Sequence, residues 1–302
     1  MTTLRARSSA KINLSLDILK RLPNGYHTIR SLVHPVGLWD EVEMSFEEHK
    51  NVLFACNDET LQDESNLCVR AFAAWREAMG ITVGATIRLH KNIPFGAGLG
   101  GGSGNAAAIL RLANSYATQK LSEEQLLAVA AKLGADVPLF LQPSPVLMEG
   151  IGDQITPVSA LAGWVVIVKP LEGFSTPAMY RAWDESGLQS QQGTEALLKE
   201  WEGGDVQRVA PHLTNDLERA AREVSALPGR CVEVLREAGA RGARMSGSGS
   251  ACFGLCATQD ECRGVEERVA EQLAKDVLLQ GATTFVAPLV AQGVEILSSE
   301  VP

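Results

Sequence analysis

Several features that mark common protein classes are missing from this 302-residue sequence. It has no CxxC pair and no histidine after His212, so its six scattered cysteines are expected to be reduced structural thiols and not metal ligands. No apolar run approaches the roughly 20 residues that span a bilayer. Acidic residues (36) outnumber basic ones (27), and no basic stretch stands out. We therefore expect a cytoplasmic protein without a targeting peptide that binds neither membranes nor nucleic acid.

Glycine, by contrast, is concentrated in one short segment. Residues 94–104 read PFGAGLGGGSG, with six glycines between Gly96 and Gly104, and an alanine-rich helical sequence follows at once. Glycine reaches positive φ without strain, so such a run turns its N–H groups inward, and the next helix adds its unpaired N-terminal donors. A flexible linker is disfavoured because linkers carry Ser, Thr or charge. The segment predicts a phosphate-binding loop.

The two common nucleotide motifs fit this loop poorly. Residues 96–101 match the dinucleotide pattern GxGxxG, but no acidic residue stands at the tip of a following strand to hold a ribose. The Walker A motif needs a lysine after its last glycine, whereas the first lysine after this loop is Lys120. A third kind of loop remains, in which glycine N–H groups and a serine hydroxyl bind the phosphates and the positive charge comes from elsewhere.

Four other segments carry candidate chemistry. Lys11 and Asn13 share one face of a predicted strand, although a lysine there is often a solvated edge residue. Asp136 follows a predicted helix within an apolar stretch, and its alternative role is to cap the next helical turn. Residues 24–27, Asn-Gly-Tyr-His, form a turn that presents an aromatic ring and an imidazole, or simply a hairpin tip. Residues 246–250 are either a tight hairpin or a place where another backbone or a ligand approaches closely.

The apolar pattern predicts an α+β fold in two halves. In the first half, it predicts helices at 66–79, 103–116 and 123–133 and strands at 4–8, 12–19, 28–36, 41–46, 52–56 and 86–89. In the second, it predicts a helical middle at 177–238 interrupted at residues 203–204, a helix at 261–275, and strands at 164–168, 241–245, 251–256 and 283–287. We place the domain boundary at residue 160, which gives an N-terminal domain 1–160 and a C-terminal domain 161–302.

Taken together and in this order, these segments resemble the GHMP kinase superfamily. The match rests on residues 10–16 with 24–27, residues 94–107, residues 134–138 and residues 243–250, and it spans nearly the whole chain. Within the superfamily, the chain is most similar to kinases of the non-mevalonate isoprenoid pathway that phosphorylate the 2-hydroxyl of a cytidine diphosphate-linked methylerythritol. The resemblance implies a β-rich α/β N-terminal domain, an α+β C-terminal domain and an active site in the cleft between them.

The resemblance also assigns roles to residues. It implies ATP and Mg²⁺ as cofactors, a small-molecule substrate, and a monomer or weak homodimer. Lys11 and Asp136 would be the catalytic pair, and Asn13 would orient the substrate. Tyr26 would stack on the cytosine, His27 would hydrogen-bond its edge, and Tyr180 would cover its opposite face. Ser103 would lie near the phosphates or the magnesium, within a set of residues expected to bind ATP: Asn66, Leu67, Lys91, Pro94, Phe95, Gly96, Ala97, Gly98, Leu99, Gly100, Gly101, Gly102, Ser103 and Gly104.

Two positions depart from the family pattern. The usual loop ends Gly-Gly-Gly-Ser-Ser-Asn, and this one has Gly104 at the second serine; the residue before Ala10 is commonly proline and is Ser9 here. Neither change removes a charged catalytic group. Three rivals stay open: another GHMP kinase acting on mevalonate, homoserine or a sugar, a catalytically silent relative that only binds a nucleotide or a protein, and a dinucleotide oxidoreductase.

Overall fold

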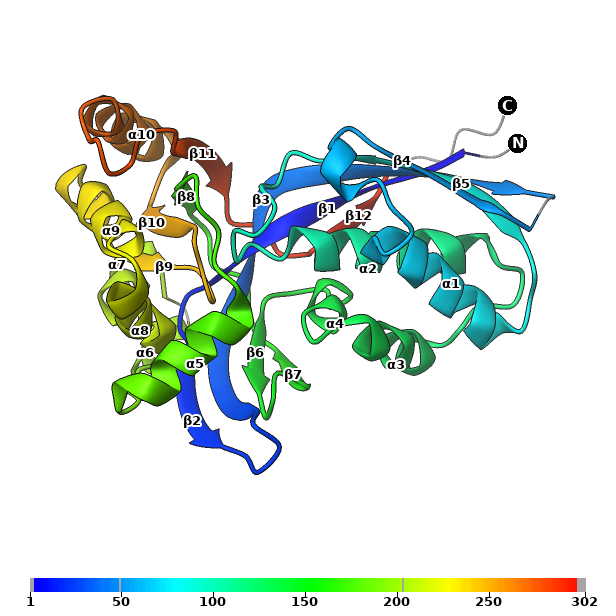
Figure 1. The fold of residues 1–302 in the computed structure, drawn as a ribbon, viewed down its shortest axis with the longest axis horizontal. Helices are drawn as coiled ribbons and strands as arrows, with labels where there is room; N and C mark the ends of the chain where they lie inside the picture. Colours follow the sequence, from blue (N-terminus) through cyan, green and yellow to red (C-terminus); the bar gives the residue numbers. More distant parts are fainter. Residues whose placement is uncertain (1–2, 49, 203, 298–302) are drawn as a thin grey trace.

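The computed structural model describes residues 3–48, 50–202 and 204–297 and shows two lobes joined by long strands (Figure 1). The first described residues lie at the far end of the N-terminal lobe (Figure 1). Within the described residues, no helix is long and apolar enough to cross a membrane. All six cysteines are buried and free, as expected from their scattered positions.

The N-terminal lobe is built on an eight-stranded sheet. Its main path runs β12-β1-β3-β5-β4, with β2, β6 and β7 attached along β3. The strands are β1 (Thr3–Asn13), β2 (Asp17–Arg21), β3 (His27–Glu47), β4 (Val52–Cys56), β5 (Gly84–His90), β6 (Val146–Glu149), β7 (Gln154–Pro157) and β12 (Val294–Ile296). Burial alternates along the outer half of β1, so one face of the sheet packs on the core and the other meets solvent.

Two of these strands are longer than the sequence predicted. The sequence predicted two separate strands at 28–36 and 41–46. That separation is wrong, because β3 runs unbroken from His27 to Glu47. Likewise, β1 continues to Asn13 with a register shift between Ser9 and Ala10. Polar residues in the inner half of β1 are buried, so the alternating pattern that marks a half-exposed strand is absent there.

Helices cover one face of this sheet (Figure 1). A short 3₁₀ turn, η1 (Glu59–Leu61), precedes α1, and the helices are α1 (Leu67–Met79), α2 (Gly101–Tyr116), α3 (Glu123–Leu133) and α4 (Val137–Phe140). A capping box begins α3: Gln125 N–H donates to the Ser122 hydroxyl, and the Gln125 side chain accepts from Ser122 N–H. Alanines 106–108 of α2 are fully buried, which lets this helix pack closely under β1.

The C-terminal lobe has a four-stranded antiparallel sheet of order β11-β8-β10-β9. Its strands are β8 (Trp164–Lys169), β9 (Ala243–Met245), β10 (Cys252–Cys256) and β11 (Thr283–Pro288). The helical segments are α5 (Thr176–Ser186), α6 (Thr194–Trp201), α7 (Val206–Val209), η2 (Ala210–His212), α8 (Asp216–Val224), α9 (Leu227–Glu237) and α10 (Gln259–Leu273). Of the break predicted at residues 203–204, Gly203 lies outside the described residues.

The lobes share a hydrophobic core. Along β8, Val165 and Ile167 join a cluster with Ile12 and Leu32 of the N-terminal lobe, whereas Val166 and Val168 face the C-terminal helices. A strand buried on both faces in this way ties the lobes together. In addition, β12 returns from the C-terminal end of the chain to pair with β1. The boundary at residue 160 stays a prediction.

Residues 188–194, which lead into α6, are attached by two buried carboxylates. Asp17 accepts hydrogen bonds from the N–H groups of Gly193 (3.0 Å) and Thr194 (2.9 Å) at the start of α6. Asp216 accepts from the Ser190 hydroxyl (2.6 Å) and from Ile18 N–H (2.9 Å). Burial raises the pKa of Asp17, and the nearby Asp216 adds to this shift. The segment is therefore part of the packed structure between the lobes.

We expect His34 to make folding stability depend on pH. Its Nδ1–H donates to the Pro35 carbonyl (2.8 Å) and its Nε2 accepts from Leu161 N–H (3.0 Å). Burial lowers the pKa of His34 to about 4. In the unfolded chain the His34 imidazole is protonated below about pH 6.5, whereas in the folded protein it stays neutral down to about pH 4. The free energy of unfolding should therefore fall by about 3 kcal/mol as the pH drops from 6.5 to 4. Urea unfolding of wild type and His34→Gln at pH 7 and 4 measures this, and an equal loss in both proteins would contradict it.

Candidate active site

The glycine segment forms the loop between β5 and α2. Gly96, Gly98 and Gly100 have φ of 66°, 72° and 71°, and Gly100 occupies the N-cap position of α2. At Gly98 a Cβ would lie 2.4 Å from the Ser246 carbonyl oxygen, so only glycine fits both the conformation and the space. The loop thus leads directly into the helix N-terminus, where unpaired N–H groups favour an anion.

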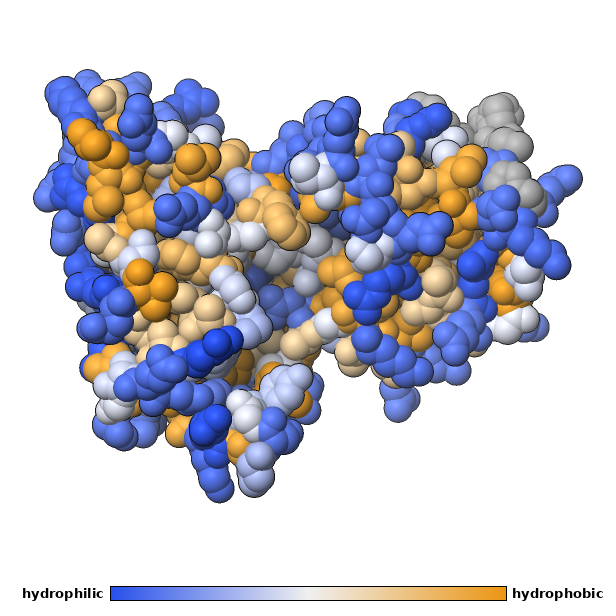
Figure 2. Space-filling view, viewed as in Figure 1, coloured by the Kyte–Doolittle hydropathy of each residue, from blue (hydrophilic) through white to orange (hydrophobic). Residues whose placement is uncertain are grey.

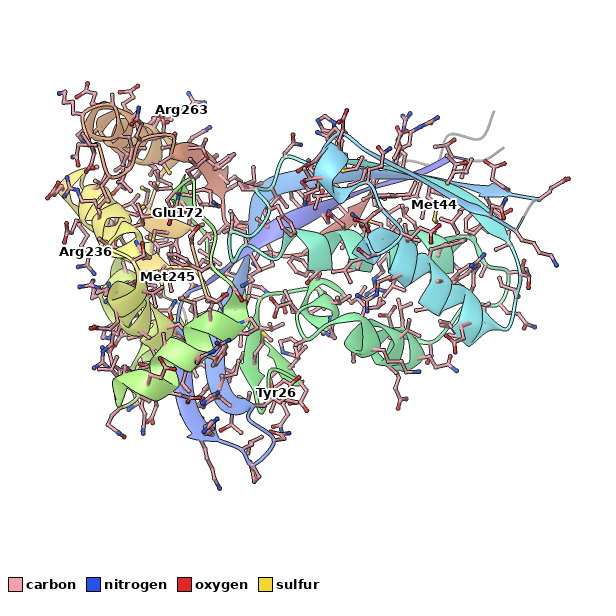
Figure 3. All side chains as sticks on the ribbon, in the orientation of Figure 1. Tyr26, Met44, Glu172, Arg236, Met245 and Arg263 are labelled. Atoms are coloured by element: carbon pink, nitrogen blue, oxygen red, sulfur yellow. The ribbon has the colours of Figure 1, made fainter. Side chains whose placement is uncertain are left out.

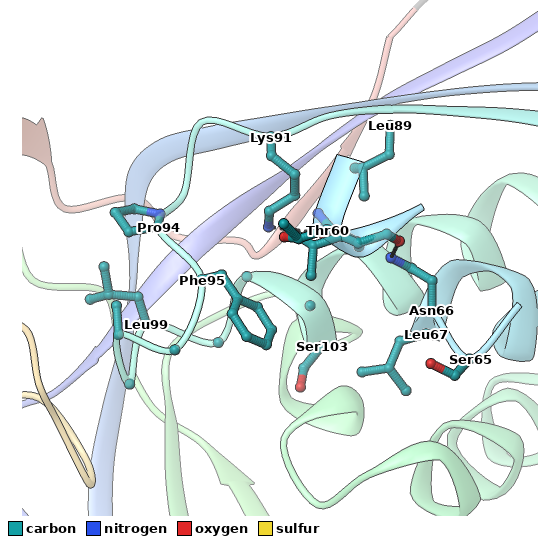
Figure 4. A pocket seen from close by; sticks show the side chains of 18 of the residues that line it. Thr60, Ser65, Asn66, Leu67, Leu89, Lys91, Pro94, Phe95, Leu99 and Ser103 are labelled. Carbon is teal, nitrogen blue, oxygen red and sulfur yellow. Dashed lines mark hydrogen bonds between the residues drawn. The ribbon is translucent and has the colours of Figure 1, made fainter. Parts of the chain in front are cut away.

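A pocket of about 600 Å³ opens over this loop (Figure 4). All the residues expected to bind ATP line it, except Gly104. Ser103 faces the pocket from the first turn of α2, and Phe95 lies at its mouth with 73% of its surface exposed (Figure 4). Asn66 also lines the pocket, but its side chain already caps α1, since Oδ1 accepts from Cys68 N–H and Nδ2 donates to the Leu61 carbonyl.

Lys91 reaches beneath the start of α2, where Asp40 holds it. Its Nζ lies 2.5 Å from Asp40 Oδ2, and a Cβ on Gly101 would lie 2.9 Å from the same nitrogen. Asp40 is fully buried and accepts further hydrogen bonds from Asn92 N–H, Ile93 N–H and Asn105 Nδ2. The sequence pointed to Lys91 but not to Asp40. This ion pair fixes the residues that lead into the phosphate loop.

Lys11 and Asp136 come together beside the glycine loop. Lys11 Nζ lies 3.8 Å from Asp136 Oδ2 and donates to Asn13 Oδ1 at 2.7 Å. Lys11 is buried, not a solvated edge residue, and burial lowers the pKa of Lys11, while the Asp136 carboxylate opposes that shift. Asp136 occupies the N-cap position of α4, but its side chain makes no capping hydrogen bond. It is therefore available to Lys11 and to a ligand.

The catalytic candidates are attached to the phosphate loop itself. Lys11 N–H donates to the Leu99 carbonyl (2.9 Å), and a Cβ on Gly100 would lie 2.9 Å from Lys11 Cγ. Both ends of the Asn13 amide are hydrogen-bonded, since Oδ1 accepts from Lys11 Nζ and Nδ2 donates to the Ser31 hydroxyl at 2.8 Å. Asn13 thus holds the ammonium group of Lys11, and the close approach of Gly100 confines its side-chain stem.

The second small-residue loop, residues 246–250, both joins two strands and meets the phosphate loop. It connects β9 to β10, and the Ser246 hydroxyl donates to the Gly98 carbonyl (3.1 Å). From the other side, Asn215 Nδ2 donates to the carbonyls of Met245 and Gly247 (2.8 Å each). The segment therefore connects two paired strands, and another backbone, that of the glycine loop, approaches it closely. It brings a C-terminal backbone against the glycine loop.

The aromatic candidates lie on the other side of the cleft, between the β2–β3 hairpin and α5. The ring of His27 stacks on Tyr180, with centroids 5.3 Å apart and an angle of 22°. Tyr26 lies beside them in the hairpin loop with 63% of its surface exposed (Figure 3). Burial raises the pKa of Tyr180 to about 12, and the charge of Asp136 adds to this shift. The space-filling view shows the surface hollowed between the two lobes (Figure 2).

Comparison with known proteins agrees with this arrangement. Residues 66–143 match the GHMP kinases N terminal domain, and residues 194–275 match the GHMP kinases C terminal domain. The 4-diphosphocytidyl-2-C-methyl-D-erythritol kinase of Geotalea daltonii is 36% identical over 90% of this chain and 96% of its own length. The one from Geobacter metallireducens is 37% identical over 89% and 95%.

This chain belongs to the 4-diphosphocytidyl-2-C-methyl-D-erythritol kinase family of GHMP kinases. A crystal structure of a 4-(cytidine 5'-diphospho)-2C-methyl-D-erythritol kinase matches with a TM-score of 0.78 and 31% identity over 94% of this chain and 98% of that one. The homoserine kinase of Cytophaga hutchinsonii, at 20% identity and a TM-score of 0.77 over 98% of this chain and 97% of its own, shares the fold. The predicted GHMP fold and the ATP-dependent small-molecule kinase class are confirmed.

The two departures from the family pattern meet at one contact. Gly104 faces β1 instead of the pocket, and a Cβ there would lie 3.1 Å from the Ser9 carbonyl oxygen and 3.3 Å from Ser8 Cβ. Ser9 N–H donates to the Gly293 carbonyl (2.8 Å), a bond that proline would lack. A serine at position 104 would therefore direct its side chain into the packing of α2 on β1 and not into the pocket.

We expect Gly104→Ser to lower stability slightly without changing ATP affinity. Overpacking costs about 1–3 kcal/mol, and the better helix propensity of serine recovers about 0.5, so the net loss should be about 1 kcal/mol. Gly102→Ser is the control for stability alone, since a Cβ at Gly102 meets only Leu67 Cδ1 at 3.6 Å but lies in the pocket lining. Denaturant unfolding and ATP titration measure both effects. Tighter ATP binding by Gly104→Ser would contradict the packing role.

Proposed function

We propose that this kinase transfers the γ-phosphoryl group of ATP to the 2-hydroxyl of 4-diphosphocytidyl-2-C-methyl-D-erythritol, giving the 2-phosphate and ADP. One observation carries the proposal: Lys11, whose ammonium faces Asp136, is hydrogen-bonded through its backbone to Leu99 of the phosphate loop. An acceptor hydroxyl beside Asp136 would therefore lie next to the phosphate end of the nucleotide. The family of the chain supports this substrate, and the geometry supports the roles proposed for the residues.

Asp136 is our candidate general base. Phosphoryl transfer depends mostly on positioning and charge stabilisation, because its transition state is loose, but a crowded tertiary alcohol must still lose its proton. The Asp136 carboxylate would accept that proton. The Lys11 ammonium at 3.8 Å favours the ionised carboxylate and stabilises negative charge that develops on the transferring group. Asn13, bonded to Lys11, would orient the substrate through that lysine.

The phosphates would be held by backbone donors. The chain carries a net charge of −9, and Lys91 is neutralised by Asp40, so the first turn of α2 must supply most of the attraction. Phe95 and Leu67 offer apolar surface for the adenine on either side of the opening (Figure 4). Residues 246–250 would close the site by contacting the phosphate loop.

Magnesium fits this site as an ion held mainly by the nucleotide. Among the described residues no three His, Cys, Asp or Glu side chains converge on a metal position. Mg²⁺ keeps several waters and is usually bound through phosphates and one or two protein oxygens. The Ser103 hydroxyl in the pocket is the oxygen we assign to it, and the ion would neutralise phosphate charge. A monomer or weak homodimer stays our expectation.

A panel of acceptors tests the proposal against the nearest rival, a GHMP kinase with another acceptor. The purified protein is incubated with ATP, Mg²⁺ and one of four acceptors: the cytidyl methylerythritol substrate, mevalonate, homoserine or galactose. We expect ADP formation with the cytidyl compound alone. Turnover of another acceptor at equal or higher kcat/KM would sink the proposal, and ATP binding without any turnover would indicate a silent relative.

We expect Tyr26→Ala to weaken binding of the cytidyl substrate and to leave binding of ATP unchanged. Tyr26 is exposed, precedes His27 of the His27–Tyr180 stack in the chain, and is not among the residues that line the pocket over the glycine loop. Loss of base stacking is worth about 1–3 kcal/mol, so KM for the cytidyl substrate should rise roughly 5- to 150-fold. Steady-state kinetics with each substrate varied in turn measures this. Equal weakening of both ligands would count against a dedicated cytosine platform.

A further inference from the structure

Asp184, which the sequence did not single out, bridges the two elements that surround the aromatic stack. It lies on α5 four residues after Tyr180, so both side chains project from the same helix face. Its Oδ1 lies 2.7 Å from His27 Nε2, and its Oδ2 lies 3.2 Å from Arg21 Nε. One carboxylate of the C-terminal lobe thus contacts both strands of the β2–β3 hairpin.

These contacts fix the orientation of the His27 ring. Its side chain is only 4% exposed, one face packs on Tyr180, and one nitrogen is bound by Asp184. The other nitrogen, Nδ1, has no hydrogen-bond partner among the residues that the structure describes. Nδ1 is nevertheless not a fully buried atom, so this nitrogen reaches accessible space.

The chemistry of the carboxylate decides which nitrogen carries the proton. An ionised carboxylate only accepts hydrogen bonds, so Nε2 must be the N–H that it binds. In a neutral imidazole Nδ1 is then left as an acceptor. Cytosine presents an amino donor at C4, where uracil presents a carbonyl acceptor. An acceptor nitrogen accepts a hydrogen bond from the amino group of cytosine and repels the carbonyl oxygen of uracil.

We propose that Asp184 is a specificity-determining positioning residue: by holding His27 in the Nε2–H tautomer, it makes Nδ1 an acceptor that selects a cytidyl over a uridyl substrate. This inference rests on the proposed function, which places the base at His27. Without Asp184 the ring can protonate on either nitrogen and rotate away from Tyr180. Leaving a polar group unpaired costs about 1–3 kcal/mol, which corresponds to a loss of selectivity of roughly 5- to 150-fold.

The test compares kcat/KM for the cytidyl substrate and its uridyl analogue in wild type and Asp184→Ala. We expect the cytidyl-to-uridyl ratio to fall at least about 5-fold in the variant, with KM for ATP unchanged. The ratio does not depend on the fraction of enzyme that is folded, so mere destabilisation would not move it. Glu185→Ala, which removes the same charge from the next position of α5, should keep the wild-type ratio, and an unchanged ratio in Asp184→Ala would overturn the proposal.

A second measurement separates this inference from the proposed function. The ¹⁵N shifts of His27 in the wild-type protein report the tautomer without any substrate, and we expect the Nε2–H form, lost in Asp184→Ala. Observation of the Nδ1–H form would overturn the role of Asp184 even if the cytidyl substrate is phosphorylated. If the tautomer is as expected and the cytidyl substrate is not turned over, the proposed function is at fault.

Discussion

Asp136→Asn should lower kcat by about 10²–10⁴-fold, because the variant loses the group that accepts the proton of the acceptor hydroxyl. Asp136 does not line the nucleotide pocket, so the Kd for ATP should change little. Its side chain is 40% exposed and makes no capping hydrogen bond, so the fold should tolerate asparagine. Single-turnover kinetics with saturating ATP and substrate measures the chemical step directly.

A matched control separates the base from a general effect of charge. Asp153 lies in the exposed turn between β6 and β7, and within the described part of the chain its carboxylate accepts only a local bond from Ile151 N–H. Asp153→Asn should therefore turn over normally. Lys11→Met should resemble Asp136→Asn in its kinetics. A near-normal kcat for Asp136→Asn would remove it as the base, and a pure rise in KM for Lys11→Met would assign Lys11 to substrate binding.

The largest effect on stability is expected from Lys91→Met, with a loss of about 3–5 kcal/mol in the free energy of unfolding. This substitution leaves the Asp40 carboxylate buried without its ammonium partner, although three N–H donors remain. The residues that lead into the phosphate loop should loosen as well, so ATP binding should weaken. Denaturant unfolding at pH 7 and ATP titration measure the two losses.

Lys11 provides the contrast. Burial lowers the pKa of Lys11, and its carboxylate partner is partly exposed, so Lys11→Met removes a costly buried charge and leaves no buried one behind. We expect its stability to be unchanged or higher while activity is lost. The double variant Lys91→Met/Asp40→Asn should recover part of the stability that Lys91→Met loses. Equal destabilisation by the two lysine substitutions would contradict this division between a structural and a catalytic lysine.

The sequence predicted a glycine loop followed by a helix because this information is local. Positive φ at Gly96, Gly98 and Gly100 fits a glycine-rich segment, whereas the helix begins at Gly101, two residues before the predicted start at residue 103. The choice of Lys11 and Asp136 depended on a family resemblance, because no local pattern joins residues so far apart in the chain. The structure places them 3.8 Å apart.

The residues that support the site were missed for a related reason. Asp40 stands 51 residues before Lys91, in a stretch with other acidic residues, and its burial appears only when β3 and β5 pair. Asp184 lies on an exposed stretch of α5 and becomes informative only through His27, which is 157 residues away. The inner half of β1 was misread because its buried polar residues Ser8, Ser9, Lys11 and Asn13 break the alternation expected of a strand.

The central claim is the transfer of phosphate to one hydroxyl of the cytidyl substrate. The purified protein should be incubated with ATP, Mg²⁺ and 4-diphosphocytidyl-2-C-methyl-D-erythritol, and the product examined by ³¹P NMR and mass spectrometry. We predict one new phosphate monoester at the 2-hydroxyl, formed in equal amount with ADP and absent with Asp136→Asn on the same time scale. Hydrolysis of ATP without a phosphorylated product, or phosphorylation at another hydroxyl, would contradict the account.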